Sequence, residues 1–346
     1  MRDIWSDLLE WDAARTPFAI ARVVGTWRSA PRSSGAGMLI TENMRVVGSV
    51  SGGCIEGAVI EEALEALKSG ESRQVTYGVE DELALSVGLS CGGKVSVFIE
   101  PHWGQSPESG TREIWEALQK ALEDNQPAVL LSRMSGPGAR HLLVLPEGTS
   151  VGDWGTEQES AEAEARQAYQ ARENQTARIG ESEVFLQVFP RRDQLLIIGA
   201  GHMTVPLVQF AAALDFQTVV IDPRKVFASA ERFPTPPDVL IPEWPQDALP
   251  QRPLNEDTYA ILLTHDPKID DPALHLLLRQ PLRYIGALGS RKTHAKRCDR
   301  LREAGFSEAE IARIKGPAGL SINAETAAEI ALSMISEVIA AKRGAL

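Results

Sequence analysis

The chain has 346 residues, of which 43% are hydrophobic and 24% charged, and its formal net charge is −12. This length favours two domains over one, and the negative charge argues against nucleic-acid binding, which needs a basic face. The chain contains no run of 18 apolar residues, so the sequence predicts no membrane span. Three cysteines do not make a disulfide framework.

The N-terminal stretch MRDIWSDLLEWDAARTP has no continuous apolar core and no small-residue cleavage site. It predicts a short amphipathic helix rather than a signal peptide. We therefore expect the protein in the cytoplasm, where thiols stay reduced. A stable Cys54–Cys91 disulfide is the less favoured alternative.

The first hundred residues predict an α+β unit. Apolar residues at helical spacing after Gly53 predict a helix over 55–68, which Gly70 ends. The predicted strands of this unit cover residues 18–27, 38–41, 45–50, 73–79 and 94–101.

The middle of the chain continues in the same α+β manner. Helices are predicted near 111–124 and 157–172, and the second of these, acidic and rich in alanine, is interpreted as a solvated face. No internal repeat is found in the sequence. The predicted strands cover residues 127–134, 141–148 and 183–190.

A different pattern begins at Arg191, where strand, glycine turn, helix and strand alternate. Such alternation predicts a parallel sheet with helices on both faces. The predicted fold class is therefore α/β. An N-terminal α+β domain over residues 1–188 precedes a C-terminal Rossmann-like, doubly wound parallel sheet over residues 191–346.

The turn Gly199-Ala200-Gly201-His202-Met203-Thr204 nearly matches the dinucleotide-binding fingerprint. Gly199 would permit the tight turn, and Gly201 would let a phosphate approach the helix N-terminus. Asp222 follows Gly201 by 21 residues, close to the spacing of a ribose-binding acid. Thr204 replaces the third glycine, and Pro223-Arg224 follows the acid, which weakens the case for NAD(P). Another phosphate-bearing ligand, or none, is the alternative.

Other polar residues follow predicted strand ends on the same side of this sheet. Ligands of open α/β sheets bind outside the carboxyl ends of the strands, so these residues are predicted to line one crevice. Caps and turns are the alternative interpretation for each residue alone. The predicted crevice residues are Gly201, His202, Asp222, His265, Asp266, Ser290 and Arg291.

Two of the three cysteines adjoin glycine pairs. Cys54 follows Gly52 and Gly53, and Cys91 precedes Gly92 and Gly93. Gly52 and Gly53 would clear space for a ligand above Cys54 and offer backbone N–H groups, and the helix dipole would act on the thiol if Cys54 lies in the first turn of the 55–68 helix. A buried, inert cysteine is the alternative.

Catalysis by a Cys–His pair would need a histidine, and the first in the chain is His102. No CxxC zinc motif is present. Soft-metal ligation, sulfur carriage and cofactor binding stay open for Cys54 and Cys91. Cys298, at i, i+4 spacing from His294, is interpreted as structural.

Several of these motifs resemble the XdhC/CoxI family. The N-terminal match is carried by VVGTWRSAPRSSGAGMLIT, VVGSVSGGCIEGAV and GLSCGGKVSVFIEP. The C-terminal match is carried by IIGAGHMTVPL, VIDPRKVFASAERFP, LLTHDPKID, YIGALGSRKTH and GLSINAETAAEIALSMISEVIA. The middle, about 103–190, is less diagnostic, and Ser321 and Asn323 depart from the family pattern.

The resemblance implies an accessory chaperone rather than a metabolic enzyme. Such a protein binds molybdenum cofactor (molybdopterin) and inserts it into the apo-enzyme of a xanthine dehydrogenase-type molybdenum hydroxylase. Cys54 and Cys91 would then hold molybdenum or carry sulfur, with a cysteine desulfurase as a further partner and a homo-oligomer as the assembly. An NAD(P)-dependent oxidoreductase is the alternative, and a scaffold for partner docking is a third.

Overall fold

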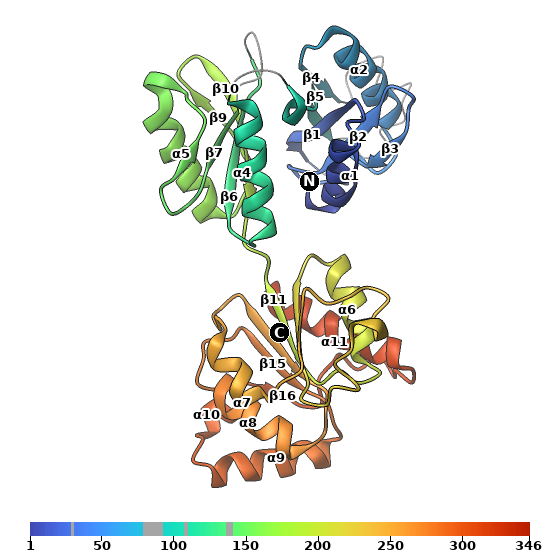
Figure 1. Ribbon diagram of the computed structural model, residues 1–346, viewed down its shortest axis with the longest axis vertical. Helices are drawn as coiled ribbons and strands as arrows, with labels where there is room; N and C mark the ends of the chain where they lie inside the picture. The colour runs from blue at the N-terminus through green and yellow to red at the C-terminus, as the bar shows by residue number, and fades with distance from the viewer. Residues whose placement is uncertain (29–30, 79–92, 107–109, 136–140) are drawn as a thin grey trace. The chain divides into compact units, whose positions relative to one another are not determined.

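The computed structural model of the chain describes residues 1–28, 31–78, 93–106, 110–135 and 141–346 (Figure 1). Contacts divide the chain into two compact units, Met1–Arg191 and Arg192–Leu346. The first unit contains two antiparallel sheets and the second contains one parallel sheet.

The first sheet has the strand order β3-β2-β1-β5-β4. Helix α2 covers one face of it and buries Val59, Ala63 and Ala66. The helix ends where predicted, because Gly70 adopts the left-handed conformation of a C-cap. The bounds are α1 Trp5–Ala13, β1 Phe18–Trp27, β2 Gly37–Thr41, β3 Val46–Gly48, α2 Glu56–Ser69, β4 Arg73–Tyr77 and β5 Lys94–Pro101.

The second sheet has the strand order β8-β7-β6-β10-β9. Helix α5 packs Ala161, Ala165 and Ala168 onto it. The interpretation of this helix as a solvated face is therefore wrong for one side, because small alanines let it lie close to the sheet. The bounds are α4 Thr111–Glu123, β6 Ala128–Arg133, β7 His141–Val144, β8 Ser150–Val151, α5 Gln158–Ala171, β9 Gln175–Ile179 and β10 Ser182–Phe189.

The two sheets repeat one topology, which the sequence did not reveal. Each is built from three strands, a helix and two strands, and each places its first strand in the centre. The registers also correspond, since Arg22 pairs with Phe98 in the first sheet and Ser132 pairs with Phe185 in the second. The paired phenylalanines match, but Arg22 and Ser132 differ, so comparison of the residues alone misses the repeat.

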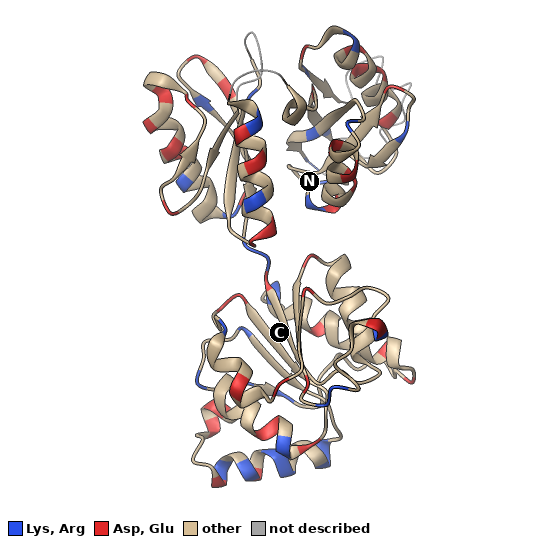
Figure 2. Cartoon of the chain, viewed as in Figure 1, with Lys and Arg blue, Asp and Glu red and all other residues tan. Residues whose placement is uncertain are grey.

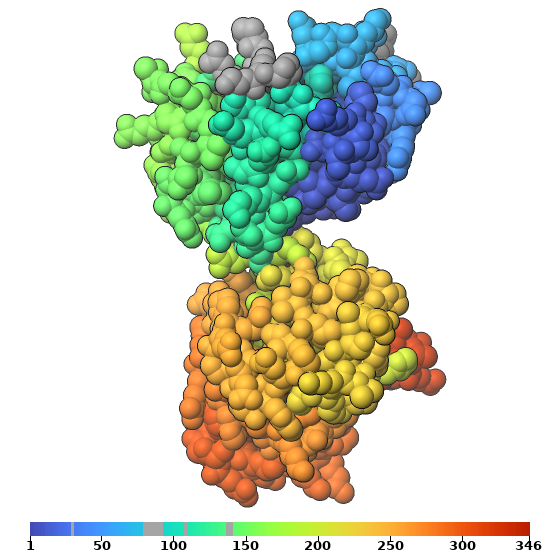
Figure 3. Space-filling model, in the orientation of Figure 1, coloured from blue at the N-terminus to red at the C-terminus, as the bar shows by residue number. Residues whose placement is uncertain are grey.

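A shared core joins the two halves of the first unit. It combines α1, α4 and residues of both sheets, including Trp11, Phe18, Leu118 and Leu130. The N-terminal residues and α4 lie side by side in this unit (Figure 3). The predicted amphipathic N-terminal helix is confirmed by α1, which buries Leu8 and Trp11.

The second unit is a six-stranded, all-parallel sheet of order β13-β12-β11-β14-β15-β16. This is the strand order of a Rossmann fold, and the predicted fold class is confirmed. The strands are β11 Gln194–Ile198, β12 Gln217–Ile221, β13 Val239–Ile241, β14 Thr258–Leu262, β15 Tyr284–Ala287 and β16 Ile314–Lys315.

Helices pack on both faces of the parallel sheet and form separate hydrophobic cores. One core contains α6 and α11, and the other contains α8 and α9. The two-residue strand β16 was not predicted, because so short a segment carries no periodicity. The helices are α6 Thr204–Ala213, α7 Pro245–Ala248, α8 Pro267–Leu277, α9 Arg291–Glu303, α10 Glu308–Ile311 and α11 Ala327–Lys342.

Candidate functional site

The crevice of the parallel sheet opens where the strand order reverses, between β11 and β14. The loops that follow these two strands touch: a Cβ on Gly199 would lie 2.6 Å from Thr264 Cγ2, and Gly199 has φ of +109°. Only glycine meets both demands, because a side chain would be strained and would collide with the neighbouring loop. Gly199 therefore shapes the crevice rather than lining it.

Gly201 stands in a different environment from Gly199. A Cβ placed on it would meet no heavy atom within 4 Å, and its φ lies outside the left-handed region. Within the described residues, the backbone N–H groups of Gly201, His202 and Met203 find no acceptor. The turn thus presents free donors and open space in front of α6, which suits a phosphate.

Thr204 explains how the fold works without the third glycine of the fingerprint. Its side chain is fully buried at the start of α6, and its Oγ1 donates to the Gly199 carbonyl oxygen at 2.7 Å. The Thr204 hydroxyl therefore holds the start of α6 against the first residue of the turn through a buried hydrogen bond. The departure at this position leaves the space in front of Gly201 open.

Asp222 ends β12 as predicted, but it is fully buried and its carboxylate is already engaged. It accepts hydrogen bonds from Ala200 N at 2.7 Å and from Arg224 N, Nε and Nη2 at 2.9, 2.9 and 2.7 Å. Burial alone would raise the pKa of Asp222, but these bonds outweigh it and hold that pKa below its usual value. The arrangement does not support the role of a ribose-binding acid.

The polar residues after β14 and β15 include two helix caps. Asp266 Oδ1 accepts from Lys268 N at 2.9 Å to begin α8, and Ser290 Oγ accepts from Thr293 N at 3.1 Å to begin α9. His202, His265 and Arg291 are exposed, and His265 has a φ of +59°. All of these residues lie at the carboxyl edge of the sheet, together with Gly201.

Two buried charged residues behind this edge were not predicted. Asp270 Oδ1 accepts from Thr264 Oγ1 at 2.5 Å, and burial raises the pKa of Asp270. Arg297 Nη2 lies 3.6 Å from Asp270 Oδ2 and donates to the Leu288 carbonyl oxygen at 3.0 Å. The pair ties α8 to α9 below the crevice. Spacing gave no signal for it, because the partners are on different helices.

The glycine-cysteine loop before α2 is built around Glu56. The Glu56 carboxylate accepts from Ser49 Oγ at 2.6 Å, Ser51 Oγ at 2.5 Å, and the backbone N–H groups of Val50, Ser51 and Gly53 at 3.2, 2.9 and 2.9 Å. Burial acts to raise the pKa of Glu56, but these donors lower it to about 2.

The same loop corrects the expected role of its glycines. Gly52 N donates to Ser49 Oγ and Gly53 N to Glu56, so neither N–H group is free for a ligand. Both glycines have positive φ, +80° and +119°, which lets the chain wrap around the carboxylate. In this structure the two glycines allow the backbone conformation of the loop.

Cys54 lies outside the helix, because Ile55 is the N-cap and α2 begins at Glu56. The condition that Cys54 lies in the first turn of the helix is therefore not met. Cys54 is half-buried, packs on the core beneath α2, and its N–H donates to Ser51 Oγ at 3.0 Å. Cys91 and Gly92 lie outside the described residues, and Gly93 is buried just before β5.

Cys298 and His294 pack against each other on α9, with Sγ 3.6 Å from Nε2. Cys298 is buried in the core of the second unit. Across the described ranges, no group of three or more His, Cys, Asp or Glu side chains is placed to hold a metal ion. The contact suits the structural role predicted for Cys298.

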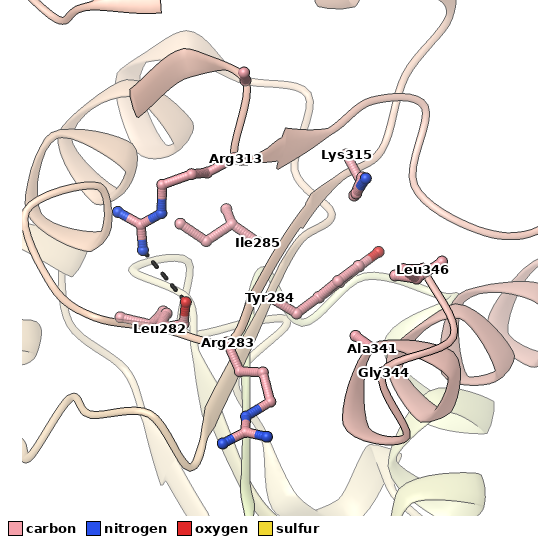
Figure 4. Close-up of a pocket in the computed structure, with 10 residues that line it drawn as sticks. Leu282, Arg283, Tyr284, Ile285, Arg313, Lys315, Ala341, Gly344 and Leu346 are labelled. Carbon is pink, nitrogen blue, oxygen red and sulfur yellow. Dashed lines mark hydrogen bonds between the residues drawn. The ribbon is translucent and has the colours of Figure 1, made fainter. Parts of the chain in front are cut away.

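Two hollows lie away from the crevice. One, of about 310 Å³, is at the amino end of β15, where Arg313 donates to the Leu282 carbonyl oxygen at 3.3 Å (Figure 4). The other, of about 450 Å³, lies between the two sheets of the first unit and is lined by hydroxyl, amide and carboxylate side chains, including Ser96, Thr176 and Glu183. Neither contains a residue predicted for the site.

Positive charge gathers beside the crevice despite the acidic composition of the chain. Lys and Arg recur along α9, which begins at the carboxyl edge of the sheet (Figure 2). Arg224 and Arg232 flank the glycine turn on the β12 side, and Arg232 Nη1 donates to the Ala200 carbonyl oxygen at 2.6 Å. These groups favour an anionic ligand.

The fold and this edge together define a Rossmann-type protein whose glycine turn has backbone N–H groups without an acceptor among the described residues. The family described as XdhC Rossmann domain matches residues 195–338, and the family described as XdhC and CoxI matches residues 11–78. Together these matches cover more than half of the chain. The chain belongs to the XdhC and CoxI family.

Three relatives are similar along most of the chain. It is 27% identical to a Bacillus subtilis protein named as a probable xanthine dehydrogenase subunit, covering 94% of this chain and 93% of the relative. It is 29% identical to the molybdenum cofactor insertion chaperone PaoD of Escherichia coli, covering 89% and 78%. It is 26% identical to the Escherichia coli protein YqeB, covering 99% of this chain but only 47%, about half, of YqeB.

A solved structure shares the fold. A crystal structure named as a xanthine dehydrogenase from Bacillus halodurans has a TM-score of 0.78 and 29% identity, with 98% of this chain and 95% of that chain covered. In the part of the chain that the structure describes, no helix is long and apolar enough to cross a bilayer.

Proposed function

We propose that this protein binds molybdenum cofactor and inserts it into a molybdenum hydroxylase of the xanthine dehydrogenase type. The observation that carries the proposal is the open glycine turn at Gly201, with its free backbone donors, in a chain similar to a molybdenum cofactor insertion chaperone. Molybdopterin ends in a phosphate, and a helix N-terminus with free N–H groups is a suitable place for it.

The names of the relatives differ in role, since one names a chaperone and others name xanthine dehydrogenase. The chaperone role fits the site better, because a carrier only has to bind and release its ligand and does not have to stabilise a transition state. The buried, saturated Asp222 disfavours the alternative of an NAD(P)-dependent oxidoreductase.

Cys54 and Cys91 complete the proposal in the first unit. A bound cofactor would supply a soft metal and sulfur, and thiolates are suitable ligands for either. Cys54 stands at the end of a loop that Glu56 holds in shape, so its position is fixed before a ligand arrives. A molybdenum hydroxylase apo-enzyme is the proposed recipient. A cysteine desulfurase as sulfur donor and a homo-oligomeric assembly stay predictions.

The direct test replaces Gly201 by valine. A Cβ placed on Gly201 would meet nothing within 4 Å, so Gly201→Val should fold normally while its side chain occupies the phosphate position. Titration with isolated molybdenum cofactor should show affinity reduced by tenfold or more, and reconstitution of a cofactor-free hydroxylase should fall in parallel.

Gly199→Ala is the matched control in the same turn. Its Cβ would approach Thr264 at 2.6 Å from a φ of +109°, so this variant should lose about 1–3 kcal/mol of stability. Undiminished cofactor binding by a folded Gly201→Val variant would give the turn a purely architectural role and remove the basis of the proposal.

A further inference from the structure

Arg224 and Asp222 form a latch beside the glycine turn. Arg224 donates through its backbone N, Nε and Nη2 to the two oxygens of Asp222 at 2.9, 2.9 and 2.7 Å, while Ala200 N donates to the same carboxylate at 2.7 Å. A carboxylate offers about four acceptor sites, so these four donors saturate it. Asp222 itself is fully buried.

The guanidinium of Arg224 is held in this position from its outer side. It stacks over the Phe227 ring at 4.5 Å, and Arg232 stacks over the same ring at 5.2 Å. Arg232 Nη1 also donates to the carbonyl oxygens of Phe227 and Ala200 at 2.8 and 2.6 Å. Through Phe227 and Arg232, the Asp222–Arg224 pair is therefore connected to the glycine turn at Ala200.

NAD⁺ needs the acid at this strand end for the hydroxyls of its adenosine ribose. Here the ribose would have to displace Arg224 from a bidentate, charge-assisted contact and then reach a buried carboxylate. A phosphate at the open side of Gly201 needs neither change, and Arg224 and Arg232 add positive charge near it.

We infer that Arg224 is the specificity determinant of the crevice, which accepts a ligand ending in a phosphate monoester and rejects dinucleotides that present a ribose diol. The inference rests on the proposed function for the location of the anion site. It adds the class of ligand and names the residue that selects it.

The test uses the full-length chain and calorimetric titration with inorganic phosphate and NAD⁺. The parent should bind phosphate and show no saturable binding of NAD⁺ at millimolar concentration. Arg224→Ala should free the Asp222 carboxylate and raise NAD⁺ affinity by about tenfold or more, the effect expected of one hydrogen bond to a charged group. Adding Asp222→Asn to this variant should abolish the gain.

Two further variants keep the test decisive. Arg224→Lys keeps the charge but cannot form the two-nitrogen contact, so it should give a smaller gain in NAD⁺ affinity and serves if Arg224→Ala is unstable. Arg302→Ala removes an exposed arginine that pairs with Glu308 at the far end of α9, and should leave both affinities unchanged.

NAD⁺ binding by the parent as tight as binding by Arg224→Ala would overturn the inference. The same holds if folded Arg224→Ala and Arg224→Lys gain nothing. The titrations contain neither molybdenum cofactor nor hydroxylase. Their result can therefore be interpreted even if the proposed cofactor delivery fails in its own test.

Discussion

Glu56 occupies the position that an anionic ligand would need in the loop from Ser49 to Cys54. Five hydrogen-bond donors converge on its carboxylate, three of them backbone N–H groups. The turn at Gly201 has comparable donors but no internal acceptor among the described residues. Two glycine-rich loops of similar sequence character therefore differ in their free donors, because one contains its own anion.

Glu56→Gln should destabilise the first unit in a pH-dependent way. The folded-state pKa of about 2 lies below the ordinary value of 4.5, so the charged form contributes stability above pH 5 that is lost as pH falls toward 2. Since the side chain is partly exposed, screening limits the difference between parent and variant to about 1–2 kcal/mol at pH 7.

Urea unfolding at a series of pH values measures this difference. It should shrink steadily below pH 4.5, because protonation then costs the parent the same charge that the variant lacks. A difference that stays constant from pH 7 to pH 3 would show that Glu56 acts through size and shape instead of charge.

Cys54→Ser and Cys91→Ser should keep the fold and weaken cofactor retention. Cys54 is half-buried at the edge of a core, so serine in its place should cost less than about 1 kcal/mol. Serine preserves size but removes the soft ligand. Cofactor retained after gel filtration measures the effect, with Cys298→Ser as the control, and parent-like retention by both variants would contradict the thiol role.

At the scale of elements, the two sheets of the first unit, which share one topology, meet at a buried polar cluster. Arg22 on β1 donates to Glu100 on β5 at 2.5 Å, to Ser132 on β6 at 2.9 Å and to Gln187 on β10 at 3.3 Å. Its guanidinium also lies 5.7 and 5.8 Å from the rings of Phe98 and Phe185, which hold equivalent registers in the two sheets. One arginine thus joins both repeats.

The repeats differ where the candidate site lies. The β9–β10 connection is a short turn at Gly180, whereas the β4–β5 connection spans the segment that contains Cys91. Gln158, the first residue of α5, folds back to Ser150 and Trp154 much as Glu56 folds back over its own loop. Because the second repeat folds without cysteines, the two thiols are not required by this topology.

Arg22→Leu should unfold or strongly destabilise the first unit. Removing Arg22 leaves the carboxylate of Glu100, which is 2% exposed, with only His141 Nε2 at 3.2 Å as an ionic partner among the described residues, at a cost of about 3–5 kcal/mol. Arg112→Leu is the matched control, since Arg112 is 68% exposed in its pair with Glu116 and should change stability by less than about 0.5 kcal/mol.

Denaturant unfolding of the two variants gives the comparison. Combining Arg22→Leu with Glu100→Gln should recover part of the loss, because the stranded charge is then removed as well. Equal stability of Arg22→Leu and Arg112→Leu would mean that the cluster does not join the repeats energetically.

At the scale of the whole molecule, the chain combines two kinds of site in separate units. The first unit presents a shaped cysteine loop, and the second presents the turn proposed to bind an anion, beside an acid that Arg224 engages. A carrier of a phosphate-bearing, metal-containing cofactor can use both without catalysing a reaction of its own. Relatives named for insertion of molybdenum cofactor and for xanthine dehydrogenase are compatible with this division.

The protein should therefore show no substantial NAD(P)-linked turnover with alcohol, aldehyde or hydroxy-acid substrates. Asp222 is unavailable to a ribose, and neither His202 nor His265 belongs to a recognisable hydride-transfer motif. A steady-state assay at micromolar protein, run beside reconstitution of a cofactor-free molybdenum hydroxylase, measures both activities. Robust nicotinamide-linked turnover without any gain in the hydroxylase would favour the oxidoreductase alternative.

The sequence by itself determined the elements whose signals are local. Periodicity and turn residues predicted α2, α4, α5 and β5 to within a residue or two, and the glycine turn with its following acid predicted the Rossmann unit. Motifs shared with the family supplied the function class. These features depend on neighbours in the chain, so they can be read from a single sequence.

The tertiary structure decided what depends on residues distant in sequence. The N–H groups of the loop before α2 are occupied because the Glu56 carboxylate accepts their hydrogen bonds. Asp222 is unavailable to a ligand because Arg224 already donates to its carboxylate. The duplicated topology and the Arg22 cluster arise from pairing between strands separated by many residues. Hydrogen-bond saturation and burial are properties of the folded surroundings, and no spacing rule along the chain specifies them.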